Sequence, residues 1–203
     1  MKNSALFDYI ETQDRDVLAR YVELRRRAYL NEYPWLPADF GREDATDRVS
    51  RTIYAVRDGK VAGGARLTIS TPARPRLMPL ENMPPEEPQF SLRDCGYLRD
   101  LHLDRKPYGE ISRMAADPEY ARGFEVSAGM GDALCRIAAS EGLDVVFSIC
   151  PPKPARINQI NAKRRGVGFR WYQEVPTVFG VNMLLCAFTG LLGVYGQWEK
   201  EAA

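Results

Sequence analysis

The dipeptide Asp58-Gly59 constrains the fold of this chain more than any other short motif. It separates two runs rich in β-branched residues that together span residues 52–70. An Asp-Gly pair is typical of the type I′ turn, in which both central residues have positive φ. The motif therefore predicts a β-hairpin over residues 52–70, so the fold must contain at least one antiparallel strand pair.

Helical and strand patterns alternate on both sides of this hairpin. The first thirty residues are predicted to be helical, because apolar residues recur at helical spacing from Leu18 to Tyr29. Acidic residues favour a helix start at Asp14 and Asp16, and Pro34 ends the pattern. The other expected elements are helices at 121–141 and 154–165 and strands at 97–103, 109–116, 144–150, 169–175 and 177–188. This order predicts an α/β fold (an α+β mixed sheet), in which helices flank both faces of a central mixed β-sheet.

The length and the charge balance narrow the class of protein. A chain of 203 residues fits one core, so we expect a single domain over residues 1–203. The 28 Lys and Arg residues nearly balance the 27 Asp and Glu residues. This balance argues against a protein that wraps nucleic acid or a polybasic membrane anchor. We therefore expect neither nucleic acid nor a membrane among its partners.

Other features of the composition point to an intracellular protein without a metal. The one histidine and the four cysteines lack the spacing of metal ligands, so no metal site is expected. The N-terminal residues do not form the apolar segment of a signal peptide, which predicts a cytoplasmic protein with reduced thiols. The uncharged segment 175–197 contains proline and several glycines, and it is predicted to be a buried strand followed by a short helix or loop. The proline-rich segment 71–90 is predicted to be a loop.

Four groups of charged and aromatic residues are the candidates for a functional site. They are Arg25, Tyr29 and Trp35 in and after the first helix, Glu43, Asp44 and Asp47 in the next loop, Arg66-Leu67 on the second hairpin strand, and Glu110-Ile111-Ser112-Arg113 on a later strand. Each group alone is also typical of an ordinary surface. Their occurrence together is less easily explained by chance, and it indicates a shared role.

The charges in these groups predict a paired network. A charged side chain in the middle of a strand is costly to bury without a partner, so Arg66 and Arg113 should each face a carboxylate. The nearest candidates are Asp44, Asp47 and Glu110. Strand alternation predicts that Ser112 shares a face with Glu110 and that Arg113 lies on the opposite face with Ile111. Such a network can bind a zwitterion, because carboxylates accept an ammonium group and arginine binds a carboxylate.

In these four groups the sequence resembles the acyl-homoserine lactone (autoinducer) synthases. That family has an Arg, an aromatic residue and a Trp at the spacing of Arg25, Tyr29 and Trp35. A Glu and two Asp, an Arg-Leu pair and a Glu-hydrophobic-Ser-Arg run follow, as in the other three groups here. Tyr29 stands where the family usually has Phe, and Met114 stands where an aromatic residue is common.

The resemblance implies a cytoplasmic enzyme with a fold similar to the GNAT acyltransferases. It implies S-adenosylmethionine as a substrate, an acyl thioester as the second substrate, and no cofactor. The catalytic residues that it implies are Glu110 as the base, with Arg113 and Asp47 placing the charged groups. The residues implied to bind S-adenosylmethionine are Arg25, Tyr29, Trp35, Asp44, Asp47, Arg66 and Ser112.

The acyl group of such a substrate needs an apolar tunnel and a carrier. Candidates for the tunnel are Met130, Leu134, Phe147, Ile149 and Trp171, although the same residues fit an ordinary core. The donor would be an acyl carrier protein or acyl-CoA. A basic cluster that could bind either donor, or simply face solvent, comprises Lys153, Arg156, Lys163, Arg164 and Arg165.

Two alternatives remain open at the level of sequence. A GNAT-type N-acyl amino acid synthase would share the fold and the acyl donor but would form no lactone. A binding or regulatory module on the same fold would catalyse nothing. Release of methylthioadenosine separates the first alternative from a lactone synthase, and replacement of Glu110 separates an enzyme from the second.

Overall fold

The computed structural model describes residues 7–71, 91–120, 124–172 and 180–196. The chain divides into two compact units: the first comprises Met1–Leu67 and Ser112–Leu134, and the second comprises Thr68–Ile111 and Cys135–Ala203. The expectation of a single domain over residues 1–203 stays a prediction. The predicted loop 71–90 lies almost entirely outside the described residues.

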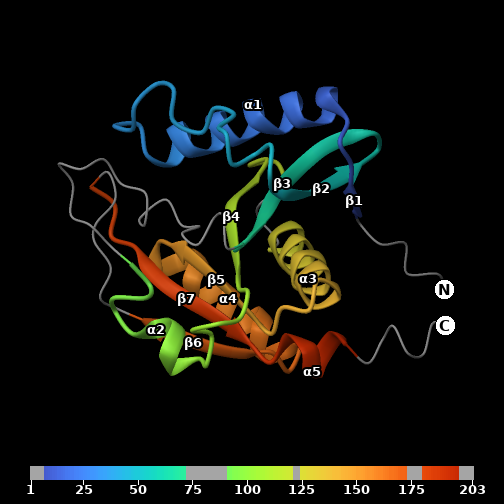
Figure 1. Ribbon diagram of the computed structural model, residues 1–203. Helices are drawn as coiled ribbons and strands as arrows, with labels where there is room; N and C mark the ends of the chain where they lie inside the picture. Colours follow the sequence, from blue (N-terminus) through green and yellow to red (C-terminus); the bar gives the residue numbers. More distant parts are fainter. Residues whose placement is uncertain (1–6, 72–90, 121–123, 173–179, 197–203) are drawn as a thin grey trace. The chain divides into compact units, whose positions relative to one another are not determined.

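Seven strands of the described residues form one mixed sheet in the order β1-β2-β3-β4-β5-β7-β6 (Figure 1). β4 pairs in parallel with β5 at Gly109 and Glu110, and the other described pairings are antiparallel. The strands are β1 (Asp8–Glu11), β2 (Arg51–Arg57), β3 (Lys60–Ile69), β4 (Gly109–Ala116), β5 (Val145–Cys150), β6 (Gly168–Tyr172) and β7 (Leu184–Thr189). The mixed sheet that the element order predicted is confirmed.

The helices follow the capping signals of the sequence. They are α1 (Arg15–Glu32), α2 (Tyr97–Asp100), α3 (Glu125–Ser140), α4 (Pro152–Arg164) and α5 (Leu191–Tyr195). Asp14 caps α1, because its carboxylate accepts hydrogen bonds from the backbone N–H groups of Asp16 and Val17. Gly142 follows α3 with a φ of 76°, as expected of a helix-ending glycine.

The hairpin is formed as the Asp-Gly motif predicted. Asp58 and Gly59 have φ values of 51° and 72°, both positive as the type I′ turn requires. Arg57 pairs with Lys60 across the turn, and β2 and β3 continue antiparallel from there. The hairpin thus sets the register that places Arg66 on β3.

In the first unit, helices cover both faces of β3. A Cβ atom on Gly64 would lie 2.6 Å from the ring of Tyr21 on α1, so this glycine lets α1 approach the sheet closely. The preceding Gly63 points to the opposite face, where its Cβ would lie 3.0 Å from Val126 on α3. Tyr21 also packs edge-on against Tyr54 on β2, with 5.6 Å between ring centroids. This packing fixes α1 over the hairpin.

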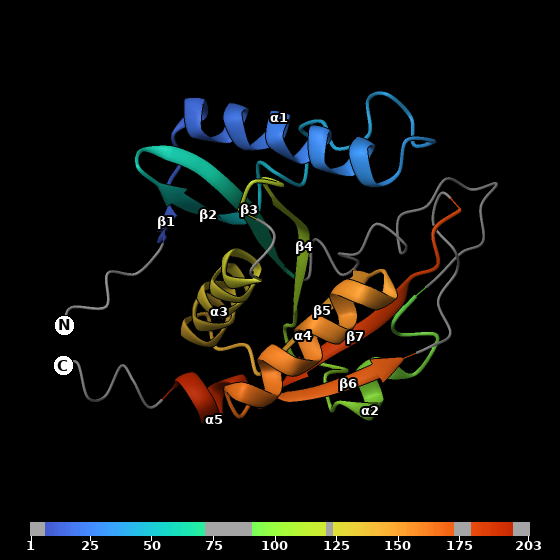
Figure 2. The same cartoon turned by 180° about the vertical axis from the view of Figure 1, so that it is seen from behind.

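In the second unit, α4 lies over one face of β5 and β7 (Figure 2), and an apolar cluster covers the other. Asn158 of α4 donates to the Sγ atom of Cys150 at 3.8 Å, which places α4 on the face of β5 that bears Cys150. The opposite face belongs to a buried cluster that comprises Leu92, Leu98, Leu103, Tyr108, Val145, Phe147, Leu185 and Ala187. The four cysteines are free thiols.

Two predictions of secondary structure were wrong. Residues 97–103 were expected to be a strand, but Tyr97–Asp100 form the helix α2. Gly96, which has a φ of 75°, precedes α2, and the helix buries Leu98 in the apolar cluster. The second error is β1: residues 8–11 were expected to belong to the first helix, but they form an edge strand through their pairing with β2.

The uncharged segment 175–197 contains a strand and a short helix, as expected, but the described residues 180–183, which were expected to belong to the strand, precede it. Leu184–Thr189 form the strand β7, whose residues 185–188 are buried, and Leu191–Tyr195 form the short helix α5. Residues 177–179, where the strand was expected to begin, lie outside the described part. None of the described helices has the length and apolar character that crossing a membrane requires.

Candidate active site

Asp47 lies at the centre of a network of buried charges in the first unit. Its two carboxylate oxygens each accept a hydrogen bond of 2.9 Å from the guanidinium of Arg25, so the pair is bidentate. Arg66 on β3 donates a third bond of 2.9 Å to the Oδ1 atom. We call the group formed by Arg25, Asp44, Asp47, Arg66, Ser112 and Arg113 the charged network.

Arg25 fixes the loop that carries the two aspartates. Its side chain is fully buried, and besides binding Asp47 it donates to the carbonyls of Gly41 at 2.7 Å and Arg42 at 2.6 Å. One guanidinium on α1 therefore holds both the backbone and a carboxylate of the loop after the helix. The predicted role of Arg25 in binding the substrate stays a prediction.

Asp44 is the more exposed of the two aspartates of the network. Its carboxylate accepts a bond of 2.8 Å from Arg66 and one of 3.3 Å from Arg113 on β4. Its side chain is 33% exposed, whereas that of Asp47 is 1% exposed. The network thus has a closed end at Asp47 and an open, acidic end at Asp44.

The arginines keep both aspartates ionised. Burial by itself would raise the pKa of Asp47, but the hydrogen bond and charge of Arg25 outweigh it and lower the pKa to about 2. Burial also opposes ionisation of Asp44, yet the positive charge of Arg66 keeps its pKa below the usual value. At neutral pH the network therefore contains two carboxylates and three guanidinium groups.

Ser112 and Arg113 both join the network, which corrects the predicted alternation on β4. The Oγ atom of Ser112 accepts a hydrogen bond of 2.9 Å from Arg66, and its neighbour Arg113 binds Asp44. Consecutive strand residues would normally point to opposite faces. Here Arg113 has a φ of 55°, a left-handed conformation that turns its side chain back toward the network.

The two aromatic residues of the first group lie in different surroundings. Tyr29 packs beside the network, with its ring 5.6 Å from that of Phe40 and its hydroxyl 3.4 Å from the carbonyl of Met114. Burial raises the pKa of Tyr29, so this phenol stays protonated. Trp35 is 61% exposed, and its ring packs edge-on against Tyr33 at the surface. The structure thus brings Tyr29, but not Trp35, to the buried part of the network.

Glu110, the predicted base, is 1% exposed. It lies on β4 two residues before Ser112, and it pairs in register with Phe147 of β5. The boundary between the two units falls between Ile111 and Ser112, so Glu110 belongs to the second unit. The strand β4 is the covalent link between this carboxylate and the charged network.

The predicted acyl-chain residues are distributed over both units. Met130 and Leu134 are fully buried on α3 in the first unit. Phe147 and Ile149 belong to the second unit, where they lie on the face of β5 that contributes to the apolar cluster. Trp171 pairs with Cys186 across β6 and β7, on the opposite face. The tunnel that these residues were predicted to line stays a prediction.

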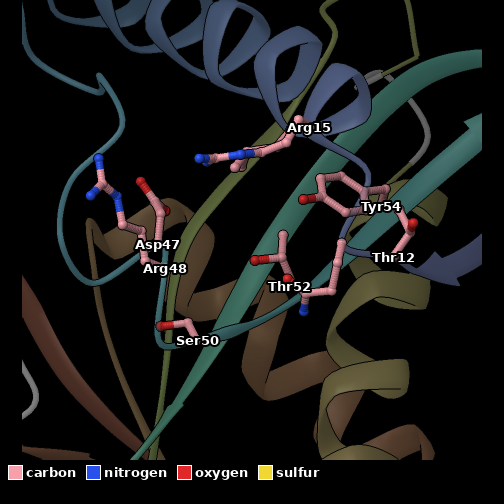
Figure 3. Close-up of a pocket in the computed structure, with 9 residues that line it drawn as sticks. Thr12, Arg15, Asp47, Arg48, Ser50, Thr52 and Tyr54 are labelled. Carbon is pink, nitrogen blue, oxygen red and sulfur yellow. The ribbon is translucent and has the colours of Figure 1, made fainter.

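A cavity of about 310 Å³ lies beside the network in the first unit (Figure 3). Figure 3 shows Arg15 of α1 across the cavity from Asp47 and Arg48 of the loop, with Thr52 and Tyr54 on β2. The full lining is Thr12, Gln13, Arg15, Leu18, Asp47, Arg48, Ser50, Thr52 and Tyr54. Sequence reasoning missed this cavity, because its residues share no motif. Asp47 is the one member of the network among them.

Sequence reasoning also missed Tyr21. This residue is fully buried, its hydroxyl donates to the carbonyl of Arg113, and the guanidinium of Arg25 lies 5.2 Å from its ring centroid. The available signal was its spacing, since Tyr21, Arg25 and Tyr29 follow one another at four-residue intervals on one face of α1.

Among the described residues, no group of three His, Cys, Asp or Glu side chains is arranged to hold a metal ion.

The basic cluster lies along α4 and just after it, with Lys153, Arg156, Lys163 and Arg164 exposed and Arg165 half-buried. Ile160, which is 43% exposed, lies on the same helix.

Comparison with known proteins gives matches among solved structures alone. No protein-family model and no curated protein sequence matches the chain. The AHL synthase LasI has a TM-score of 0.58 and 14% identity, over 94% of this chain and 96% of that chain. The CoA-dependent acyl-homoserine lactone synthase BjaI, solved with SAM and isopentyl-CoA, has a TM-score of 0.61 and 15% identity, over 98% of this chain and 89% of that chain.

An N-acyl amino acid synthase has a similar TM-score. FeeM, an N-acyl amino acid synthase from uncultured soil microbes, has a TM-score of 0.59 and 12% identity, over 96% of this chain and 93% of that chain. Identities this low establish the fold and not the reaction. The chain therefore has the mixed α/β, GNAT-like acyltransferase fold that acyl-homoserine lactone synthases and N-acyl amino acid synthases share.

Proposed function

We propose that this chain is an acyl-homoserine-lactone synthase, which acylates the amine of S-adenosylmethionine and then closes the lactone. The observation that carries the proposal is the charged network. It joins Arg25, Asp44, Asp47, Arg66, Ser112 and Arg113, all of which the family resemblance had named as site residues. The shared fold supports acyl transfer as the class of reaction.

The open end of the network suits the charges of S-adenosylmethionine. Asp44 is ionised and partly exposed, so it can contact the ammonium or sulfonium group of the substrate. Arg113 is 20% exposed beside it and can bind the substrate carboxylate. Asp47 has both oxygens occupied by arginines, so its role is to position Arg25 and Arg66.

The first step needs a base, because an ammonium group is not a nucleophile. Glu110 is a buried carboxylate two residues before Ser112 on β4, and we assign it the role of accepting the proton, directly or through a water molecule. The free amine then attacks the carbonyl carbon of the acyl thioester. An amide bond forms, the carbon–sulfur bond breaks, and the carrier leaves as a thiol.

The second step closes the ring within one bound molecule. The carboxylate of the acylated substrate attacks its own γ-carbon, and the bond from that carbon to the sulfonium sulfur breaks. The electron pair moves to the sulfur, so neutral methylthioadenosine leaves and a lactone remains. Proximity of the two reacting groups favours this step, since both belong to the same molecule.

The acyl donor is either an acyl carrier protein or acyl-CoA. Both are anionic, and the basic residues Lys153, Arg156, Lys163 and Arg164 on α4 present positive charge to solvent. The exposed Ile160 between them offers an apolar contact of the kind that protein partners use. Charge reversal at Arg156 and Lys163 should therefore raise the KM for the donor and leave the KM for S-adenosylmethionine unchanged.

Two products measured in one reaction test the proposal. The purified chain is incubated with S-adenosylmethionine and either acyl-CoA or acyl carrier protein, with acyl groups of several lengths. Thiol release reports acylation, and methylthioadenosine, separated by chromatography, reports lactonisation. We expect the free thiol and methylthioadenosine in equal amounts, together with a lactone-ring fragment in the mass spectrum of the product. Thiol release without methylthioadenosine, and absence of both products, would each overturn the proposal.

Glu110→Gln tests the base and separates an enzyme from a binding module. Glutamine keeps the shape of the side chain but cannot accept the proton, so kcat should fall by about 10²–10⁴. The matched control is Glu119→Gln, the same change at an exposed position, which should leave kcat unchanged. Undiminished turnover in Glu110→Gln would show that Glu110 is structural.

The competing function is an N-acyl amino acid synthase, and the similarity to FeeM favours it among the alternatives. That enzyme class would release thiol with a free amino acid as acceptor and would form no methylthioadenosine. Replacing S-adenosylmethionine by a panel of free amino acids in the same assay distinguishes the two. We expect no acylation of the free amino acids.

A further inference from the structure

Two tyrosines on α1 reach the backbone of β4. The hydroxyl of Tyr21 donates to the carbonyl of Arg113, and that of Tyr29 lies 3.4 Å from the carbonyl of the next residue, Met114. Both flank Arg25 at four-residue spacing, so the three side chains lie on one face of the helix. The face of α1 that holds Asp47 therefore also binds the backbone of β4.

This backbone has an unusual conformation at Arg113. Four described residues other than glycine have positive φ, namely Asp58, His102, Arg113 and Phe124. Only Arg113 among these four lies inside a strand. A left-handed residue with a long side chain is unfavourable in itself, so contacts of the surrounding structure must stabilise it.

Tyr21 is rigidly placed to make such a contact. Its ring packs edge-on against Tyr54, lies 5.2 Å from the guanidinium carbon of Arg25, and fills the space that a side chain on Gly64 would occupy. The residue is fully buried, which raises the pKa of its phenol. The hydroxyl thus stays a hydrogen-bond donor across the physiological pH range.

We propose that Tyr21 is a positioning residue for the charged network. By binding the carbonyl of Arg113, its hydroxyl holds that residue in the left-handed conformation that directs the guanidinium to Asp44. Without this bond, β4 can return to regular alternation, which would point the Arg113 side chain away from Asp44. This inference rests on the proposed function only for the expected effect on the binding of S-adenosylmethionine.

A coupling measurement tests the inference without reference to any activity. The coupling between Arg113→Ala and Asp44→Asn is the factor by which one substitution changes the effect of the other on the unfolding equilibrium constant. In the wild-type background we expect a coupling of about two- to fivefold, as for a partly exposed ion pair. In the Tyr21→Phe background the coupling should vanish. Tyr9→Phe removes a hydroxyl that likewise donates to a backbone carbonyl, that of Glu125 at 3.0 Å, but lies outside the network, so it should leave the coupling intact.

The kinetic test uses the same two variants. Phenylalanine keeps the ring of Tyr21 and its packing, so a purely structural role would leave the KM for S-adenosylmethionine unchanged. We expect Tyr21→Phe to raise this KM about three- to tenfold, a factor typical of one hydrogen bond, and Tyr9→Phe to have no effect.

The two measurements separate the possible failures. If the coupling persists in Tyr21→Phe, the inference is wrong whatever the enzyme does. If the coupling vanishes but the wild-type chain forms no lactone, the positioning role of Tyr21 is supported and the proposed function is overturned. An unchanged KM together with a lost coupling would limit the role of Tyr21 to the structure of the network.

Discussion

One loop carries two sets of ion pairs with opposite physical character. Asp47 points inward, where Arg25 and Arg66 bind it with three hydrogen bonds and its side chain is 1% exposed. Glu43, four residues earlier, has a side chain that is 34% exposed. Its Oε1 atom lies 3.5 Å from Arg15 and 3.3 Å from Arg48, two side chains that are 74% and 71% exposed.

The difference shows that charge pairing alone does not identify a site. The outer pairs are long, solvated and screened by salt, so they contribute little to stability. The inner group is desolvated, and its members depend on one another because removal of one leaves another charge buried without compensation. The nearly neutral composition of the chain conceals this contrast, since both sets contribute equally to the charge balance.

Asp47→Asn should cause the largest loss of stability. Asparagine has nearly the same shape but no charge, so Arg25 and Arg66 remain buried beside a neutral group. We expect the free energy of unfolding to fall by about 3–5 kcal/mol, measured by urea denaturation. The control is Asp39→Asn at an exposed position of the same loop, which should change it by less than about 0.5 kcal/mol. Equal effects of the two substitutions would contradict the contrast between inner and outer pairs.

Acid should weaken the same inner group. The folded-state pKa of Asp47 is about 2, below the value of about 3.9 expected in the unfolded chain. A lowered pKa means that the stabilisation is complete above about pH 4 and is lost as the pH falls toward 2. We expect this carboxylate to account for about 2 kcal/mol of the loss, by comparing urea denaturation of wild type and Asp47→Asn across this range. If the free energy of unfolding fell with pH equally in wild type and Asp47→Asn, Asp47 would not be the titrating group.

Asp44→Asn should separate stability from function. Because Asp44 is 33% exposed, water can solvate the arginines that it leaves, and we expect a loss of only about 1 kcal/mol in the free energy of unfolding. The KM for S-adenosylmethionine should nevertheless rise at least tenfold, since the positively charged group of the substrate loses the Asp44 carboxylate that binds it. A large loss of stability with an unchanged KM would assign Asp44 to the same structural role as Asp47.

Sequence reasoning located the charged network but not its geometry. The hairpin, the helix caps and the pairing of strand arginines with carboxylates follow from local patterns and from the cost of burying charge, so they were predictable. The left-handed conformation of Arg113 was not, because it depends on a hydrogen bond from a distant helix and no glycine marks it. The helix at Tyr97–Asp100 was missed for a similar reason, since burial of Leu98 in the apolar cluster outweighs the local pattern.

Glu43→Gln should have the smallest effect and completes the comparison. The substitution removes the charge that Arg15 and Arg48 share, but both guanidinium groups are largely exposed and water replaces the lost interaction. We expect the free energy of unfolding to change by less than about 0.5 kcal/mol in low salt, and the difference from wild type to disappear in 1 M NaCl because salt screens exposed charges. Asp47→Asn, measured in the same two buffers, should keep most of its destabilisation at high salt. If salt instead removed the effect of Asp47→Asn, the inner network would be accessible to solvent, and the division between a buried structural end and an open end for the substrate would be wrong.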